Sequence, residues 1–342
     1  MNTYKEAKGI NELVSKATKI LIIQADNPDG DSLGSSLALE QILGDLGKDP
    51  VMYCGVEIPK YLHHMPGWDR VQKDIPNQFD LSIIVDTSAI NLLESMDRKN
   101  QRSWISAKPC IVLDHHDVKA SIPFATIVCY QPVVATGEII YELCHQNGWN
   151  ISLSALNALA TSVLSDSLGL MSEATSARTV HIIAEMIEKG VDLAKLDNDR
   201  RGTMRKSPEL IKYKAKLLER IEYFYNDRIA IVTIPWTEIA QYSQSYNPSM
   251  LVLDEMRMTE NTDIAIAFKL YNDGKITAKI RCNYGIGIAN KLAEHFGGGG
   301  HKYASGFKIV DGRNLETIKS ECIELSTELL KSIKEKNPDE TL

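Results

Sequence analysis

The fold class is decided by residues 19–47, KILIIQADNPDGDSLGSSLALEQILGDLG. Residues 19–25 are an apolar run of strand length, and residues 33–47 have the spacing of an amphipathic helix that ends at a glycine. Asn, Pro, Asp and Gly, which favour turns, join the two segments. Further short apolar strands are predicted at 49–54, 80–86 and 109–114. Strands this apolar, alternating with helices, indicate a parallel sheet that is covered on both faces.

Helical patterns follow the strands, and the second half of the chain begins a new pattern. Helices are predicted at 135–148, 152–166 and 176–190. Residues 191–225 are rich in Lys and Arg and predict a turn followed by one long polar helix, which we interpret as a linker. A basic run is usually a solvated helix face, and a role in contacting phosphate is the less favoured alternative.

The C-terminal third predicts strands at 228–234, 262–271, 274–282 and 305–310, with helices between and after them. The sequence Asn-Asp-Gly between the second and third of these strands is a strong hairpin signal. We therefore expect an α/β protein with an N-terminal parallel-sheet domain and a smaller mixed α/β domain, joined by a helical linker. The expected bounds are 1–190, 191–225 and 226–342.

Composition narrows the classes of function. A length of 342 residues suits two domains, and the net charge of −7 argues against a protein that coats long duplex DNA. The acidic net charge favours a small anionic substrate that binds in one local positive site. No apolar run approaches the roughly 20 residues that span a bilayer, and the N-terminus does not resemble a signal peptide. With six scattered cysteines and no CxxC pair, we expect a cytoplasmic protein with buried free thiols.

Acidic and histidine side chains follow the predicted strands, where open parallel sheets bind ligands. Crowded carboxylates repel one another unless cations neutralise them, and oxygen ligands with an imidazole suit Mn²⁺ or Mg²⁺. Two such ions can generate hydroxide for hydrolysis at phosphorus. Taken singly, each residue could be an ordinary turn residue or a helix cap. The candidates are Asp29, Asp31, Asp86, Asp114, His115, His116 and Asp166.

A second signal lies in GGGGHKYASG, residues 297–306. Four glycines, Gly297, Gly298, Gly299 and Gly300, precede His301. Glycines let the backbone approach an anion closely, and His301 together with Arg281 could bind phosphate oxygens. A flexible tether is the alternative, but it is unexpected between a helix and a strand within a domain.

The motifs NPDGDSLGS, Asp86, Asp114-His115-His116, SDSLGL and GGGGHKYASG occur in the order seen in DHH-family phosphoesterases, which the chain resembles over nearly its whole length. The last motif is similar to that of the DHH-associated C-terminal domain. The most similar branch comprises oligoribonucleases (nanoRNases) and pAp phosphatases. The resemblance implies Mn²⁺-dependent hydrolysis of short single-stranded RNA or DNA, or of small nucleotides such as pAp, by a homodimer. Hydrolysis of cyclic or linear dinucleotides is the alternative.

The resemblance also implies roles for individual residues. One Mn²⁺ would be held by Asp31, Asp86, His115 and Asp166, and a second by Asp29 with the shared Asp86. His116 would orient a ligand or touch the phosphate. Arg281, His301 and the four glycines would hold the substrate from the second domain.

One position departs from the family pattern. The family has His-x-x-Pro-Asp-x-Asp where this chain has Ala25-Asp26-Asn27-Pro28-Asp29-Gly30-Asp31. Alanine has no donor atom, so one ion keeps only two implied ligands. Gln24 or Asp26 could compensate, although Gln24 is expected to point to the opposite side of the strand. Two readings stay open: a weak first site filled with substrate, and a nucleotide-binding regulator with impaired catalysis.

Overall fold

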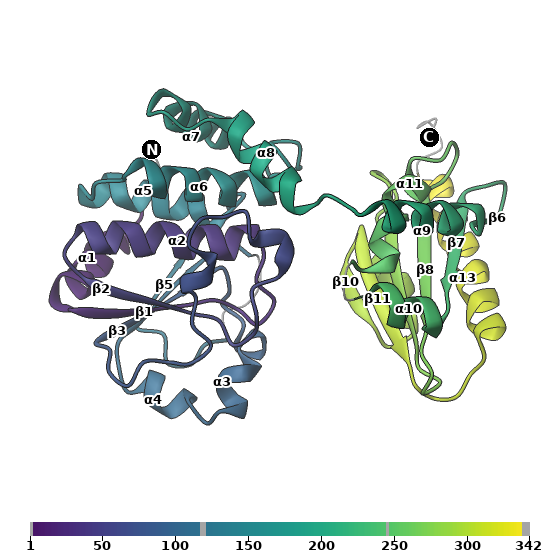
Figure 1. Cartoon of the computed structure of the whole chain (residues 1–342), viewed down its shortest axis with the longest axis horizontal. Coiled ribbons are helices and arrows are strands. Elements are labelled where there is room, and N and C mark those ends of the chain that lie inside the picture. Colours follow the sequence, from purple (N-terminus) through teal and green to yellow (C-terminus); the bar gives the residue numbers. More distant parts are fainter. Residues whose placement is uncertain (1–2, 117–120, 244–245, 337–342) are drawn as a thin grey trace. The chain divides into compact units, whose positions relative to one another are not determined.

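The computed structural model describes residues 3–116, 121–243 and 246–336. It divides into two compact units, Met1–Arg205 and Lys206–Leu342 (Figure 1). Each unit has its own β-sheet and its own hydrophobic clusters. The predicted α/β class, with a parallel sheet first and a mixed sheet second, is confirmed.

The sheet of the first unit has five parallel strands in the order β2-β1-β3-β4-β5. The predicted strands before residue 115 are confirmed within a residue or two at each end. A strand at Ile127–Tyr130 was not predicted, because its four residues are too short for a clear pattern. The strands are β1 (Lys19–Ile23), β2 (Asp49–Tyr53), β3 (Leu81–Val85), β4 (Cys110–Asp114) and β5 (Ile127–Tyr130).

Helices cover both faces of this sheet, as Figure 1 shows. Ile20 and Ile22 of β1 pack into the cluster on the side of α2, α5 and α6, while Leu21 and Ile23 pack with the short helices α3 and α4. This alternation explains why every β1 residue after the first is buried. The helices are α1 (Ala7–Lys16), α2 (Gly30–Asp45), α3 (Glu94–Arg98), α4 (Arg102–Ser106), α5 (Thr136–Asn147), α6 (Leu153–Asp166), α7 (Ala177–Glu188) and α8 (Leu193–Thr203), with short 3₁₀ helices at Lys60–Leu62, Trp68–Arg70 and Ile90–Leu92.

Helices α2 and α6 touch closely because Gly34 of α2 carries no side chain. A Cβ at this position would lie 2.7 Å from the carbonyl oxygen of Ala158 in α6. We expect Gly34→Ala to lower the free energy of unfolding by about 1–3 kcal/mol through overpacking. Urea denaturation of the purified chain measures this.

Gly44, in the same helix, supplies the matched control. It is exposed, and a Cβ there would have no atom within 4 Å. Gly44→Ala should be neutral or stabilise by up to about 1 kcal/mol, because alanine is the better helix former. Equal losses from the two substitutions would contradict a close α2–α6 contact at Gly34.

The basic segment after residue 190 differs from the single long helix that was expected. It forms two helices, α8 in the first unit and α9 (Pro208–Glu219) in the second, followed by a short strand β6 (Glu222–Phe224). Ser207 caps α9, and Pro208 occupies its first turn. A proline disfavours helical backbone at the residue before it, so one helix cannot run through this point.

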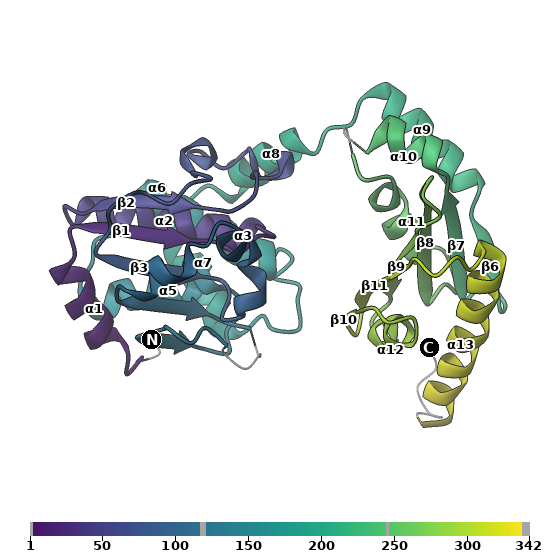
Figure 2. The same cartoon turned by 90° about the horizontal axis from the view of Figure 1, so that it is seen from below.

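The second sheet has the order β10-β11-β9-β8-β7-β6, in which only β7 and β8 pair in parallel. The predicted hairpin is confirmed by the antiparallel pairing of β8 and β9. One face packs on α12 and α13 (Figure 2), and the other packs on α9, α10 and α11. The elements are β7 (Ile229–Ile234), α10 (Trp236–Tyr242), a 3₁₀ helix (Pro248–Leu251), α11 (Leu253–Arg257), β8 (Ile264–Leu270), β9 (Ile276–Cys282), α12 (Ala289–His295), β10 (Gly299–His301), β11 (Ala304–Ile309) and α13 (Leu315–Lys336).

The state of the cysteines and the character of the helices were also predicted from the sequence. All six cysteines are buried and free, as predicted. Among the described helices, none combines the length and apolar character needed to cross a bilayer.

Candidate metal centre

The first sheet has a topological switch point between β1 and β3. From β1 the chain goes to β2 on one side and then crosses to β3 on the other. Open parallel sheets bind ligands at such a point, beyond the carboxyl ends of the strands. Asp31 follows β1 through the start of α2, and Asp86 follows β3 directly. The fold therefore places both carboxylates at the edge where a ligand is expected.

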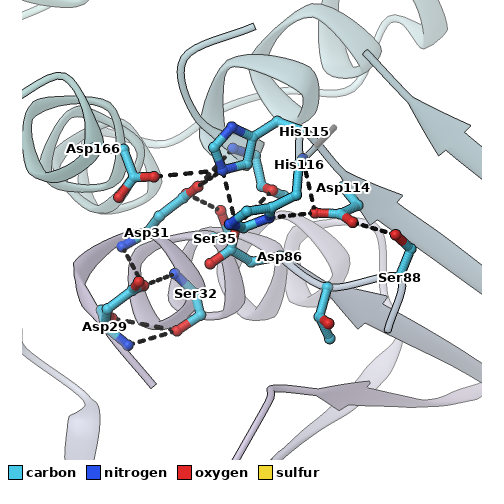
Figure 3. A network of polar contacts seen from close by, with 12 residues as sticks. Asp29, Asp31, Ser32, Ser35, Asp86, Ser88, Asp114, His115, His116 and Asp166 are labelled. Atoms are coloured by element: carbon cyan, nitrogen blue, oxygen red, sulfur yellow. Dashed lines mark hydrogen bonds and ion pairs between the residues drawn. The ribbon is translucent and has the colours of Figure 1, made fainter. Parts of the chain in front are cut away.

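His115 lies at the centre of a ring of carboxylates (Figure 3). Its Nε2 atom is 3.5 Å from Asp31 Oδ2, 3.3 Å from Asp86 Oδ1 and 3.4 Å from Asp166 Oδ2. Its other ring nitrogen, Nδ1, lies 3.1 Å from the carbonyl oxygen of Val133 and can donate a proton to it. The contact with Val133 fixes the ring so that Nε2 faces the carboxylates.

Asp31 and Asp86 are buried, His115 and Asp166 are partly buried, and the four groups interact strongly. Burial, together with the Asp31 carboxylate, raises the pKa of Asp86 well above its usual value. Burial also raises the pKa of Asp166. Burial alone would lower the pKa of His115, but contacts with Asp166, Asp86 and Asp31 raise it to about 11. Positive charge close to these carboxylates would relieve their mutual repulsion, and a divalent cation would supply it.

The backbone at Asp86 is strained. Its φ of 61° lies in the left-handed region, which residues other than glycine rarely adopt. Such strain concentrates at functional sites, where surrounding contacts maintain it. Here the hydroxyl of Thr136 donates to Asp86 Oδ1 at 3.1 Å and holds the carboxylate toward His115.

Asp31 is held by hydrogen bonds from three helices. Ser35, one turn later in α2, donates to Oδ1 at 3.0 Å, and Ser162 of α6 donates at 2.5 Å. The backbone N–H of Thr136, at the start of α5, donates to Oδ2 at 2.7 Å. These donors stabilise the ionised carboxylate where a cation can reach it. Ser35 could have been found from its i+4 spacing to Asp31, whereas no sequence signal connects Asp31 with Ser162 or Thr136.

His116 is oriented by Asp114 rather than by the central cluster. Its Nδ1 lies 2.8 Å from Asp114 Oδ1, and the other oxygen of Asp114 accepts a hydrogen bond from Ser88 at 2.6 Å. Asp86 Oδ1 is farther from this nitrogen, at 3.8 Å. The His116 ring is partly exposed and contacts the ring of His115, so it borders the site and can meet a ligand.

Asp29 has a structural role as the N-terminal cap of helix α2. Its Oδ1 atom accepts hydrogen bonds from the backbone N–H groups of Asp31 and Ser32, which caps helix α2. Its charge still acts on the cluster, because it raises the pKa of both Asp86 and Asp166. Asp29 is therefore near the carboxylate ring, but its capping oxygen already has two partners.

The departure at Ala25 leaves its neighbours in different situations. Ala25 is buried, and the Asp26 carboxylate accepts a hydrogen bond from the backbone N–H of Ser95 at 2.6 Å. Asp26 is thus already engaged. Gln24 is fully buried, and neither polar atom of its amide has a hydrogen-bond partner among the described residues. Side chains alternate between the two faces along a strand, and Ile20 and Ile22 of β1 face α2. Gln24 comes two residues after Ile22 and is therefore expected to point toward α2 as well.

The donor set around His115 fits a divalent cation. Nε2 of His115 is buried, and within the part of the chain that the structure describes it makes no regular hydrogen bond beyond its contacts with the three carboxylates. Two ligand atoms of one ion lie roughly 3 Å apart because each bond is about 2.1 Å long. The distances of 3.3–3.5 Å from Nε2 to three carboxylate oxygens approach this spacing. A ligating histidine usually donates its other N–H to a carbonyl or carboxylate, as Nδ1 can to Val133.

Two groups of ligand atoms lie together in the described residues: Asp31, His115 and Asp166, and Asp86, His115 and His116. Asp29 belongs to neither group. The sequence-predicted residues of the first unit therefore converge, with Asp29 at the margin. Their individual roles as ligands remain a proposal.

The substrate residues expected in the second unit share one face of its sheet. Arg281 of β9 and His301 of β10 both pair with Ala304 of β11, one on either side. Directly opposed residues project to the same face, so Arg281 and His301 flank Ala304 there. Arg281 is half-buried, and burial lowers its pKa; His301 is exposed.

The four glycines are not equivalent, and part of the run is strand rather than loop. A Cβ at Gly298 would collide with the carbonyl oxygen of Gly306, and one at Gly300 would lie 2.7 Å from that of Ala304. Gly300 also has a φ of 136°. These two glycines are required for close contact with β11. Gly297 and Gly299 have open space beside them and stay candidates for approach by an anion.

Comparison with known families shows what the first unit is similar to. Residues 19–165 match the model of the DHH family, N-terminal domain. This stretch of the first unit is similar to that family domain. The match covers Asp31, Asp86 and His115 and ends one residue before Asp166, the last residue of α6. DHH-family phosphoesterases are hydrolases, and the chain belongs with them in that class.

Similar proteins extend the likeness beyond this domain. The chain is 24% identical over 335 residues to the bifunctional oligoribonuclease and PAP phosphatase NrnA of Mycoplasma pneumoniae, covering 94% of this chain and 98% of that protein. It is also 24% identical over 194 residues to a probable manganese-dependent inorganic pyrophosphatase of Streptococcus mutans, covering 52% and 57%. The crystal structure of an exopolyphosphatase-related protein from Bacteroides fragilis has the same fold, with a TM-score of 0.83, 21% identity and coverage of 95% and 97%.

Proposed function

We propose that the chain hydrolyses the phosphoester bonds of short single-stranded oligonucleotides and of small nucleotides such as pAp, with Mn²⁺ as its metal. The observation that carries the proposal is His115 Nε2 facing three carboxylate oxygens at the switch point of the first sheet. The likeness to an oligoribonuclease and PAP phosphatase over 94% of the chain supports the choice of substrate.

In this proposal Asp31, Asp86, Asp166 and His115 hold one cation. The mixed oxygen and imidazole donors suit Mn²⁺, and Mg²⁺ is the alternative. When bound, the cation polarises the phosphate and lowers the pKa of a water molecule that attacks it. Thr136 and Ser162 keep the carboxylates in place for this task.

A second cation would use Asp86 and Asp29. Asp29 would offer the oxygen that does not cap α2. With Ala25 at the position of the usual histidine, we propose that this site is weak and fills when the substrate phosphate adds ligands.

Substrate would also be held by the second unit. Arg281 and His301 project from one face of its sheet, and Gly297 and Gly299 leave room for a phosphate oxygen. A guanidinium is well suited to bind phosphate in two places at once. A homodimer and a cytoplasmic location stay predictions from the sequence.

The buried Ala25 motivates a second candidate, a nucleotide-binding regulator with impaired catalysis. A regulator would bind nucleotides without turning them over. The two candidates therefore differ in one observable, which is product formation.

The test is incubation of the purified chain with Mn²⁺ and three kinds of substrate: a 5′-labelled RNA series of increasing length, pAp, and a linear dinucleotide. We expect mononucleotide release from the shortest RNAs, phosphate release from pAp, and little action on longer RNA. Binding without any product would favour the regulator, and turnover of the dinucleotide alone would favour the dinucleotide phosphodiesterase.

A further inference from the structure

The face of the second sheet that carries Arg281 and His301 also carries two half-buried lysines, Lys269 and Lys279, that no role yet explains. On β9, Lys279 lies two residues before Arg281 and therefore on the same face. Lys279 pairs with Ala267 of β8, and Lys269 lies two residues after Ala267. The basic residues of this face are thus His301 of β10, Arg281 and Lys279 of β9, Lys269 of β8 and Lys308 of β11.

Small residues separate these basic side chains and leave this face of the sheet open. Lys279 lies opposite Gly306 of β11 on one side and Ala267 on the other. A hollow of about 480 Å³ lies here, and Lys269, Lys279 and Gly306 are among the residues that line it. Helices α9, α10 and α11 pack over β7 and β8 but do not close this part of the sheet, where Lys279 remains partly exposed.

The two lysines are crowded without a compensating anion. Lys269 donates a hydrogen bond to Asn247 Oδ1 at 2.6 Å, and among the described residues neither lysine forms an ion pair. Burial and the charge of Lys279 lower the pKa of Lys269 to about 8, and burial and Arg281 lower that of Lys279. In a chain with a net charge of −7, local positive charge left uncompensated in this way indicates a site for an anion.

The spacing of these cations matches a ligand with more than one phosphate. Lys279 and Arg281 are two residues apart on one strand, a separation of roughly 6.8 Å. This is comparable with the separation of successive phosphates along a nucleotide chain. One phosphate at Arg281 and His301 would therefore place the next near Lys279 and Lys269.

We propose that Lys279 and Lys269 form a second phosphate subsite, which makes the chain prefer nucleotides with two phosphate groups over those with one. The subsite extends the proposed substrate face of Arg281 and His301 and rests on that assignment. Its ligands are nucleoside bisphosphates and oligonucleotides of at least two residues.

Calorimetric titration of the full-length chain with pAp and with AMP, without metal, tests the subsite. We expect wild type to bind pAp at least about tenfold more tightly than AMP, since a charge-assisted contact is worth on the order of 1.5–3 kcal/mol. Lys279→Gln and Lys269→Gln should each remove most of this preference by weakening pAp binding alone. Lys279→Arg should retain it.

Lys291→Gln is the matched control, because it removes one exposed positive charge from α12, which packs on the other face of the sheet. Equal affinity of wild type for pAp and AMP, or equal weakening of both ligands by Lys279→Gln, would overturn the subsite. Thermal unfolding shows whether each variant is folded. If Lys279→Gln has a folding defect, the preference of Lys269→Gln for pAp over AMP decides whether the subsite exists. This experiment measures binding and not turnover. A chain that prefers pAp over AMP but hydrolyses neither would refute the proposed function and still support the subsite.

Discussion

Asp86→Asn is expected to lower turnover by roughly 10³-fold or more, because a metal contributes several kcal/mol of transition-state stabilisation. Asp86 is the carboxylate that both proposed ions share, and it lies 3.3 Å from His115 Nε2. Asparagine has the same size and keeps an oxygen that can accept from Thr136. The loss should therefore come from the missing charge rather than from the fold.

Initial rates of pAp hydrolysis with saturating Mn²⁺ measure this effect, and thermal unfolding confirms that the variant is folded. Asp197→Asn is the control, because Asp197 is an exposed carboxylate of α8 that pairs with Arg200 and Arg201. Turnover by Asp86→Asn within a few-fold of wild type would show that the chemistry does not occur at this cluster.

Ala25→His should strengthen the weaker metal site. Loss of a group that merely orients a ligand typically costs about 10–100-fold in metal affinity, so an added direct ligand should gain at least as much. We expect the Mn²⁺ concentration for half-maximal turnover to fall by about tenfold or more. Manganese titration of turnover, together with the bound Mn²⁺ per chain measured by elemental analysis, checks both parts.

The control for Ala25→His is Ala25→Leu, which adds volume to this buried position without a donor atom. It should give no gain in Mn²⁺ affinity. If wild type already binds two Mn²⁺ tightly and Ala25→His changes nothing, another residue supplies the missing ligand. Gln24 is then the first residue to test, because its buried amide has no hydrogen-bond partner among the described residues.

The parts of the first unit that follow from local pattern were predictable. Apolar runs of six or seven residues identified β1 to β4, and the acidic residues after them lie at the carboxyl edge of the sheet as expected. Asp166 was found as the end of an amphipathic helix, although only the packing of α6 against α2 brings it to His115. The prediction worked because strand ends in a parallel sheet converge whatever the loops do.

Contacts between distant segments could not be predicted. The hydroxyl of Ser162 and the amide of Thr136 hold Asp31 across more than 100 residues of chain, and nothing in either local sequence indicates it. The glycine run after residue 296 was read as an anion loop, but Gly298 and Gly300 are required by close contact with β11. Only the strand register shows this.

In the second unit, the residues of one strand could be placed from the sequence, but the contacts between strands could not. The alternation in ITAKIRC, residues 276–282, already indicates that Lys279 and Arg281 share one face of a strand. Their relation to His301 and Lys269 depends on the pairing of β8 to β11, which the pattern of a single strand does not contain.

Hydrolysis of phosphoesters by this chain should depend on a divalent cation bound by His115 and the carboxylates around it. The most direct test is pAp and short-RNA hydrolysis by wild-type protein that has been stripped with a chelator, before and after Mn²⁺ is added back. We expect no turnover in the stripped protein and restoration of turnover by Mn²⁺, with mononucleotide as the product. Undiminished turnover without metal, or no turnover at any Mn²⁺ concentration despite nucleotide binding, would contradict it.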